Sequence, residues 1–227
     1  GGISWLYGGD GDDTYKINSG SGVVYISDSG VFAGGDTLSF GDGIDPSQIT
    51  LGLGSLKLDL GNGDVIHIEN FDPTDALNSS AIQRFEFADG TVLTAQELMA
   101  RGFDIEGTDG NDRLIGTNVD DRITGGLGND ALSGGIGNDT YYYSRGDGVD
   151  YIDDAWTWMG PDGIPVGDTN SLVLGPNIDA AALVPYLDYA TRHVTLRLDD
   201  GGAVDIGLVD NIAVQSLSFA DGSSQWI

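Results

Sequence analysis

Large apolar residues recur at every ninth position between residues 107 and 142 of this chain. They are Leu114, Ile123, Leu132 and Tyr141. An aspartate stands two places before each of them, and these aspartates are Asp112, Asp121, Asp130 and Asp139. Glycine opens each unit, and the units follow one another without a gap. An unbroken register over four copies defines an internal repeat, and such repeats are typical of repetitive architectures.

The same pattern opens the chain. Residues 8–16 (GGDGDDTYK) place Asp13 and Tyr15 in the aspartate and apolar positions. A looser copy follows the long run, where residues 145–153 (RGDGVDYID) place Asp150 in register. Repeat turns are therefore expected in two separate parts of the chain.

These units share the pattern GGxGxDxUx, in which U is a large apolar residue. The pattern resembles the nonapeptide repeat of the RTX (haemolysin-type) calcium-binding family. The resemblance implies an all-β fold, a parallel β-roll, in which each repeat is a turn followed by a short strand and two repeats form one coil. Turns two repeats apart would then stack on the same edge of the roll, and several calcium ions would lie between stacked turns.

The spacing of stacked strands agrees with the size of a calcium site. Neighbouring strands lie about 4.8 Å apart, and calcium–oxygen bonds are about 2.3–2.6 Å long, so an ion midway between two turns can bond to both. Glycine allows positive φ in the turn, and an all-oxygen ligand set favours calcium over zinc. Carboxylates stacked about 5 Å apart repel by roughly 3 kcal/mol per pair at an effective dielectric near 20. This repulsion predicts that calcium binding and folding are coupled.

The resemblance assigns the calcium ligands to the turns. In the first run they are Gly8, Gly9, Asp10, Gly11 and Asp13. In the second run they are Gly107, Thr108, Asp109, Gly110, Asp112, Gly116, Asn118, Asp121, Gly125, Gly126, Leu127, Gly128, Asp130, Gly134, Gly135, Ile136, Gly137, Asp139, Gly146, Gly148 and Asp150. The alternative, that these Asp/Gly stretches are ordinary hairpin turns, stays open mainly for Asp13 and Asp36.

Four further aspartates are expected near the ends of the runs. Asp36 and Asp168 are predicted to take the repeat-aspartate position after longer loops, on the same edges as Asp13 and Asp139 respectively. Asp28 and Asp153 follow the strands of the last turns and resemble the terminal calcium ligands of RTX proteases.

The segments outside the runs also repeat, at an offset of about 130 residues. Residues 34–45, 55–70 and 84–93 match residues 166–179, 193–208 and 216–225. They resemble the haemolysin-type calcium-binding-related segment that follows RTX repeats. The sequence therefore predicts two tandem modules: residues 1–106, with repeats in 1–28 and a β cap with a short helix in 29–106, and residues 107–227, with repeats in 107–154 and a β cap in 155–227.

Local patterns predict the elements of the caps. LKLDL (56–60) and VIHIE (65–69) alternate apolar and polar residues, as half-buried strands do. GNGD and ADG are hairpin-turn sequences. A short helix is expected at residues 94–101, because Thr94 and Glu97 can form a capping box and Gly102 can end the helix.

Composition narrows the function classes. Acidic residues outnumber basic ones 36 to 9, for a net charge of −27, which argues against nucleic acid and anionic membranes and favours cations. Cysteine is absent, so disulfides and thiolate metal sites are excluded. No apolar run is long enough to span a membrane and no signal peptide begins the chain. Because the first residues fall inside a repeat, we expect the chain to be part of a longer protein.

Other motifs carry weaker hypotheses. Trp156 and Trp158 fall in a Gly/Pro-rich insertion that could bind a glycan or a protein. Arg145-Gly146-Asp147 spells an adhesion tripeptide but sits in a repeat turn, and His67 and His193 have no partner pattern. No GxSxG or HExxH motif occurs, so no enzyme activity is predicted.

The leading functional hypothesis is a structural calcium-binding module of a secreted, extracellular protein. The resemblance implies export by type I secretion machinery and folding in external calcium. The alternative is an adhesive or carbohydrate-binding module of an RTX adhesin.

Overall fold

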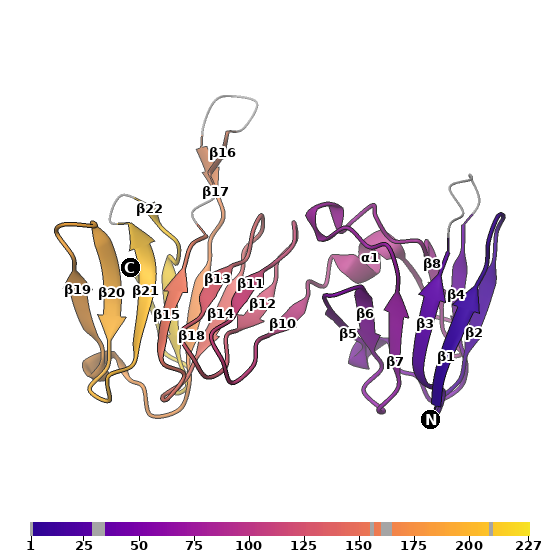
Figure 1. Cartoon of the computed structure of the whole chain (residues 1–227), viewed down its shortest axis with the longest axis horizontal. Coiled ribbons are helices and arrows are strands. Elements are labelled where there is room, and N and C mark those ends of the chain that lie inside the picture. The colour runs from indigo at the N-terminus through magenta and orange to yellow at the C-terminus, as the bar shows by residue number, and fades with distance from the viewer. Residues whose placement is uncertain (1, 29–34, 155–156, 160–164, 209–210) are drawn as a thin grey trace. The chain divides into compact units, whose positions relative to one another are not determined.

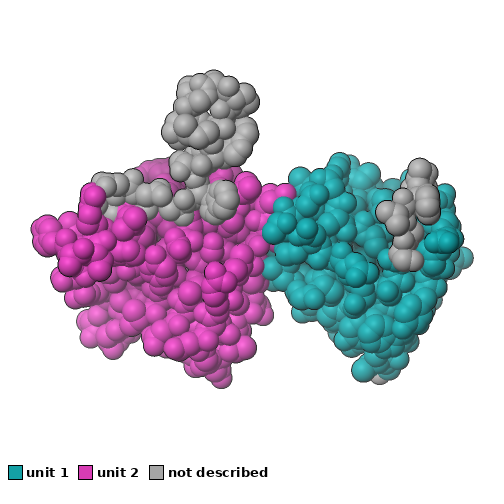
Figure 2. All heavy atoms as spheres, turned by 45° about the horizontal axis from the view of Figure 1, so that its top comes forward, with its two compact units in different colours: residues 1–104 teal, residues 105–227 magenta. Residues whose placement is uncertain are grey.

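The computed structural model describes residues 2–28, 35–154, 157–159, 165–208 and 211–227. The contacts divide the chain into two units, residues 1–104 and 105–227 (Figure 2), and each unit is described by itself. Both units are built mainly of β-strands (Figure 1), and α1 (Ala95–Met99) is the one α-helix among the described residues.

Unit 1 contains two sheets, and consecutive repeat strands go to alternate sheets. The first has the order β1-β3-β7-β6-β5 and consists of β1 (Gly2–Tyr7), β3 (Gly22–Ser27), β7 (Val65–Ile68), β6 (Leu56–Asp59) and β5 (Thr50–Gly52). The second has the order β2-β4-β8-β9 and consists of β2 (Thr14–Ile17), β4 (Thr37–Phe40), β8 (Arg84–Glu86) and β9 (Val92–Thr94). Strands β1, β3 and β7 pair in parallel, as do β2, β4 and β8, and antiparallel hairpins complete each sheet.

Unit 2 repeats this arrangement with additional repeat strands. One sheet has the order β10-β12-β14-β18-β23-β24 and consists of β10 (Asp104–Glu106), β12 (Arg122–Thr124), β14 (Thr140–Tyr143), β18 (Ser171–Leu174), β23 (Ser216–Phe219) and β24 (Ser224–Trp226). The other has the order β11-β13-β15-β21-β20-β19 and consists of β11 (Arg113–Ile115), β13 (Ala131–Ser133), β15 (Val149–Ile152), β21 (Ala203–Leu208), β20 (His193–Arg197) and β19 (Val184–Leu187), with β22 (Asn211–Ile212) beside β21. A separate hairpin joins β16 (Thr157–Met159) and β17 (Pro165–Gly167).

The strand register confirms a coil of two nonapeptides. Arg113 pairs with Ala131 and Arg122 with Thr140, in parallel, so strands two repeats apart are neighbours. Neighbouring repeats nine residues apart lie in different sheets. The two-residue insertion after Asp139 is absorbed in the turn, because Ala131 pairs with Tyr151. The all-β parallel roll with β-rich caps is therefore the observed fold.

The apolar repeat position fills the space between the two sheets. Ile123, Leu132 and Tyr141 are buried, and the residues on either side of each point outward. In unit 1 the same position is held by Tyr15 and Ile26, which are also buried. Successive side chains of a strand face opposite sides. The residue two places before the buried apolar residue, which is the repeat aspartate, therefore also points towards the roll.

The expected cap elements are present. LKLDL and VIHIE form the antiparallel hairpin of β6 and β7, and ADG connects β8 to β9. Thr94 and Glu97 form the capping box of α1, and Gly102 has a positive φ of 77°. Short 3₁₀ turns occur at η1 (Pro46–Gln48), η2 (Pro73–Asp75) and η3 (Ala180–Ala182). In the described part of the chain, α1 and the 3₁₀ turns are all too short to cross a membrane.

Candidate metal centre

A column of aspartates joins successive turns on each edge of unit 2. The Asp112 N–H donates to Asp130 Oδ1 at 2.9 Å, and the Asp130 N–H donates to Asp150 Oδ1 at 3.1 Å. On the other edge, the Asp121 N–H donates to Asp139 Oδ1 at 2.7 Å. Asp130, Asp139 and Asp150 thus each use one carboxylate oxygen to hold the preceding turn.

The second carboxylate oxygen of these aspartates is a candidate metal ligand. Asp130 and Asp139 are 1% and 0% exposed, and their Oδ2 atoms are buried without a hydrogen-bond partner among the described residues. Asp13 Oδ2 in unit 1 is in the same situation. Buried polar atoms are nearly always paired, and a buried carboxylate without a partner is costly. These orphaned oxygens therefore fit an ion between the turns.

The turns approach each other closely enough to require glycine. Gly128 has a φ of 134°, and a Cβ there would lie 2.6 Å from the Gly110 carbonyl oxygen. Gly126 also has positive φ, and a Cβ there would overlap the Thr108 carbonyl oxygen. The glycines thus bring backbone carbonyls of stacked turns together, and such oxygens can complete an oxygen-rich cation site.

The electrostatics of the column favour protons or cations. Burial, with the charges of Asp154 and Asp121 nearby, raises the pKa of Asp139 to about 8. Burial, with the charges of Asp130 and Asp147, raises the pKa of Asp150 to about 7. Both shifts mean that the folded roll disfavours the ionised carboxylates unless a positive charge compensates them.

The end of the roll in unit 1 gathers three carboxylates. Ligand oxygens of Asp13, Asp28 and Asp36 lie within 4.8 Å of one another. The Asp13 N–H donates to Asp36 Oδ1 at 2.8 Å, and the Tyr15 hydroxyl donates to Asp28 Oδ2. Burial raises the pKa of Asp36, with the charges of Asp28 and Asp13 adding to the effect. The sequence had placed Asp13 and Asp36 on one edge, and the structure brings them together.

Two predicted ligands at the end of unit 2 are wrong in position. Asn170, and not Asp168, lies beside Asp139, because Thr140 pairs with Ser171 and the Asp139 N–H donates to Asn170 Oδ1 at 2.8 Å. Asp168 is half-buried outside this column.

The other correction concerns the residue after β15. Asp153 is exposed, whereas Asp154 is buried and accepts the Tyr141 hydroxyl and the Gly135 N–H. Asp154 is the counterpart of Asp28, since both follow their tyrosine by thirteen residues. The shared Tyr–Asp spacing was the signal that could have identified it.

The structure also places the remaining turn residues. The side chains of Leu127 and Ile136 are about half exposed and apolar, so these residues can bind an ion only through their backbone carbonyls. Asp10 and Asp109 are exposed, so they can bind an ion through the backbone or through a carboxylate at the surface. The glycines of the predicted ligand set lie in the turns between strands. No side-chain hydrogen bond joins Asp10 or Asp109 to another turn among those found in the described residues.

A second ladder, missed from the sequence, runs in the opposite sense. Asn111 Oδ1 accepts the Asn129 N–H at 2.9 Å, and Asn129 Oδ1 accepts the Val149 N–H at 2.8 Å. On the other edge, Asp120 Oδ1 accepts the Asn138 N–H at 2.8 Å. In this ladder a side-chain oxygen of each turn accepts an N–H of the following turn, whereas in the aspartate column it accepts an N–H of the preceding turn. These exposed residues act between turns without needing an ion.

A glutamine of the cap ends one column in each unit. Gln83 Oε1 accepts the Asp36 N–H at 2.8 Å, and Gln215 Oε1 accepts the Asn170 N–H at 2.7 Å. Each glutamine directly precedes a cap strand, β8 or β23. Asp64 adds a link in unit 1, since its carboxylate accepts the N–H groups of Gly20 and Gly22.

Other sequence motifs have structural partners. The Arg145 guanidinium donates to Asp199, Asp200 and the Asn177 carbonyl, so the arginine of the adhesion tripeptide is already bound within the chain. His193 Nδ1 lies 2.9 Å from Asp205 Oδ1, and His67 Nδ1 lies 2.8 Å from Ser55 Oγ. Trp156 and the Trp158 side chain lie outside the described residues.

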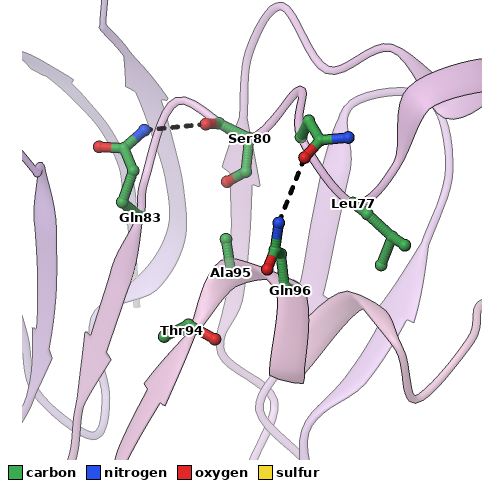
Figure 3. A pocket seen from close by; sticks show the side chains of 7 residues that line it. Leu77, Ser80, Gln83, Thr94, Ala95 and Gln96 are labelled. Atoms are coloured by element: carbon green, nitrogen blue, oxygen red, sulfur yellow. Dashed lines mark hydrogen bonds between the residues drawn. The ribbon is translucent and has the colours of Figure 1, made fainter. Parts of the chain in front are cut away.

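A hollow of about 250 Å³ in unit 1 lies among the cap residues (Figure 3). Its lining consists of Leu77, Asn78, Ser80, Gln83, Thr94, Ala95 and Gln96. These residues include no carboxylate, histidine or basic group, so this lining provides no group for acid–base chemistry.

Comparison with protein families identifies the nonapeptide repeats and the cap segment of unit 1. Residues 1–24 and 106–141 match the RTX calcium-binding nonapeptide repeat, and residues 56–97 match the haemolysin-type calcium binding protein related domain. These matches confirm the resemblance seen in the sequence. RTX nonapeptide repeats bind Ca²⁺, so the chain carries a calcium-binding β-roll of the kind found in secreted proteins, and this repeat domain is structural rather than catalytic.

No curated protein matches the chain. Among solved structures, the extracellular lipase LipA from Serratia marcescens is similar over 92% of this chain at 15% identity, with a TM-score of 0.31. The chain spans 37% of that lipase chain. With so low a TM-score, the likeness carries no argument about fold or function.

Proposed function

We propose that this chain is a structural, secretion-associated β-roll that is unfolded at low calcium and folds when calcium binds outside the cell. The observation that carries the proposal is the set of buried, unpartnered oxygens of Asp13, Asp130 and Asp139 at the stacked turns. Calcium would be held by these carboxylates, by Asp112, Asp121 and Asp150 in the same columns, and by carbonyls of the glycine-rich turns.

Without calcium, repulsion between the stacked carboxylates opposes the folded state. Stacked carboxylates about 5 Å apart repel by roughly 3 kcal/mol per pair at an effective dielectric near 20. The core between the two sheets is small, because β12 and β13 each bury only their central side chain, Ile123 and Leu132. Domain stabilities are about 5–15 kcal/mol in total, so a few uncompensated pairs suffice to unfold the repeats. A chain of this kind suits export by type I secretion machinery in an unfolded state.

Circular dichroism of the whole chain tests the proposal. In EDTA the spectrum should be that of a coil, and a few millimolar calcium should convert it to β-structure. Magnesium should be a poor substitute, because it requires shorter bonds and near-octahedral geometry. Sodium chloride at the same ionic strength is the control for simple screening. A cooperative fold in EDTA, or one induced equally by sodium chloride, would contradict the proposal.

A second candidate is an adhesive or carbohydrate-binding role for the insertion before β18. The observation that favours it is that the insertion forms its own hairpin, in which β16 pairs with β17 outside both roll sheets. A glycan array should show binding that Trp156→Ala and Trp158→Ala abolish. If the unchanged chain binds no glycan on the same array, the adhesive role is contradicted and only the structural role remains.

A further inference from the structure

The outer faces of the two units differ at one pair of equivalent positions. In unit 1, Trp5 of β1 lies opposite Tyr25 of β3. In unit 2, Ala131 of β13 lies opposite Tyr151 of β15. The two tyrosines are equivalent, because each directly precedes the buried isoleucine of its strand. An indole in unit 1 is thus replaced by a methyl group in unit 2.

The ring of Tyr25 in unit 1 is enclosed in a stack of three rings. The ring centroids of Trp5 and Tyr25 lie 4.4 Å apart, and the ring planes differ by 13°. His67 of β7 stacks on Tyr25 at 4.7 Å and 12°. Strand β3 lies between β1 and β7 in the sheet, so the two partners approach Tyr25 from opposite sides. Both faces of this ring are therefore covered within the unit.

The ring of Tyr151 in unit 2 has a stacking partner on one side. His193 of β20 stacks on it at 5.5 Å and 28°, and β20 lies on the β21 side of β15. On the other side, where β13 and β11 follow in the sheet, a hollow of about 340 Å³ has Arg113, Ala131 and Tyr151 in its lining. This hollow therefore lies at the place that Trp5 fills in unit 1.

Arg113 provides the far wall of the hollow. It lies opposite Ala131, so one row across the outer face consists of Arg113, Ala131 and Tyr151. Neighbouring strands lie about 4.8 Å apart, so the strands that carry Arg113 and Tyr151 are about 9.6 Å apart. The gap between these side chains is thus about one flat ring wide, with room for stacking on both of its faces.

The charge of Arg113 suits an aromatic ring in this gap. A guanidinium within about 6 Å of a ring centroid is attracted to the negative face of the ring. No hydrogen bond or ion pair of Arg113 is found within the described parts of the chain, so its charge is not used internally. A pyranose ring is a poorer fit, because it has no π face for the guanidinium and its chair is thicker than a flat ring.

We infer that the hollow beside Tyr151 binds a tryptophan side chain of a partner protein, with the indole between Tyr151 and Arg113. The stack of Trp5 on Tyr25 in unit 1 is the internal precedent for this occupant. The site lies on the outer face of the roll, whereas the proposed calcium ligands lie in the turns. It therefore adds a docking surface for a partner to the structural role of the roll.

A nuclear magnetic resonance titration of the isotope-labelled whole chain in saturating calcium tests this inference. The probe is N-acetyl-tryptophanamide, an uncharged mimic of a tryptophan in a polypeptide. The backbone N–H signals of Ala131, Ser133 and Tyr151 should shift together and reach saturation at millimolar probe. Ala131→Trp should abolish these shifts, because it builds the arrangement of Trp5 into unit 2.

Arg113→Gln should weaken binding of the probe by roughly threefold or more, since it removes the attraction of the cation for the ring. Arg122→Gln is the matched control, because Arg122 holds the same position in its repeat but lies on β12 in the other sheet. Its affinity for the probe should equal that of the wild-type chain. Circular dichroism confirms that each variant is folded.

The outcomes separate this inference from the proposed function. The inference is overturned if the probe shifts none of these signals, or if methyl β-glucoside shifts them and the probe does not. Wild-type affinity in Arg113→Gln or in folded Ala131→Trp also overturns it, and Arg113→Gln decides if Ala131→Trp does not fold. A chain that folds without calcium and still binds the probe in this way would remove the proposed function and support the inference.

Discussion

Replacement of Asp130 by alanine tests whether the aspartates act through specific positions. Asp130 is 1% exposed, its Oδ1 accepts the Asp112 N–H at 2.9 Å, and its Oδ2 has no partner in the part of the chain that is described. Loss of a hydrogen bond to a buried charged group lowers stability by about 1.5–3 kcal/mol, and loss of a metal ligand adds to this. We expect Asp130→Ala to lower the free energy of unfolding by at least about 2 kcal/mol in saturating calcium, which is more than a tenfold change in the equilibrium.

The comparison variant is Asp112→Ala at the start of the same column. Asp112 is half-buried, and its Oδ2 accepts the Thr108 N–H and hydroxyl within its own turn. No aspartate precedes it in this column of unit 2, so under the proposed calcium binding it would serve one ion where Asp130 would serve two. Its loss should lower stability less and raise the calcium midpoint less than Asp130→Ala does.

The assay is urea unfolding in saturating calcium, followed by circular dichroism, together with calcium titration of each variant. Asp109→Ala is the charge-matched control, because Asp109 is exposed in the same turn as Asp112 and apolar residues occupy its position in other turns, as at Leu127. We expect it to behave as the wild-type chain. Equal losses in all three variants would mean that the aspartates act only as diffuse charge, and would refute the stacked-turn argument.

Two further outcomes follow from the site. The raised pKa values of Asp139 (about 8) and Asp150 (about 7) mean that the calcium-free folded state binds protons that the unfolded chain has released, so its stability should increase as the pH falls from about 8 towards 4. Protons and calcium then compete for these carboxylates, so the calcium concentration at the midpoint of folding should be higher at pH 6 than at pH 8. Identical midpoints at the two pH values would contradict the role of these carboxylates as calcium ligands. Gly128→Ala should lower stability by at least about 2 kcal/mol, because positive φ alone costs about 1–3 kcal/mol and the Gly110 carbonyl leaves no room. Gly146→Ala, with positive φ but open space around it, should lose less in the same urea assay.

The coil could be predicted because its determinants are local and repeated. Register and burial follow from the apolar position, and the two-residue insertion before Asp150 changes only the turn. The predicted position of Asp168 in the column was wrong, because a local sequence motif was given more weight than the alternation of side chains along the strand. Asp168 was chosen because Gly167-Asp168-Thr169 resembles Gly35-Asp36-Thr37, yet the core position is set by Leu172, and the residue two places before it is Asn170.

Alternation also explains Asp153 and Asp154. Ile152 is buried, so the next side chain points outward and the one after it points inward. The cap glutamines could not be found this way, because Gln83 and Gln215 reach the column from segments far away in the sequence. Their role depends on how the cap strands dock, and no short-range pattern encodes that.

The aspartate column has a direction, and the direction limits how the roll can change in length. Each turn presents an N–H that the carboxylate or amide oxygen of the following turn accepts, so a column is open at its far end until a cap residue closes it. Gln83 closes the column that ends at Asp36, and Gln215 closes the column that ends at Asn170. An extra coil of two repeats inserted upstream would leave both columns intact and move the terminator along with the cap. A single extra repeat would exchange the two edges and bring the glutamine to the wrong one. Such a roll can therefore gain or lose repeats only in pairs, because only a whole coil keeps the cap glutamine on the edge of the column that it closes.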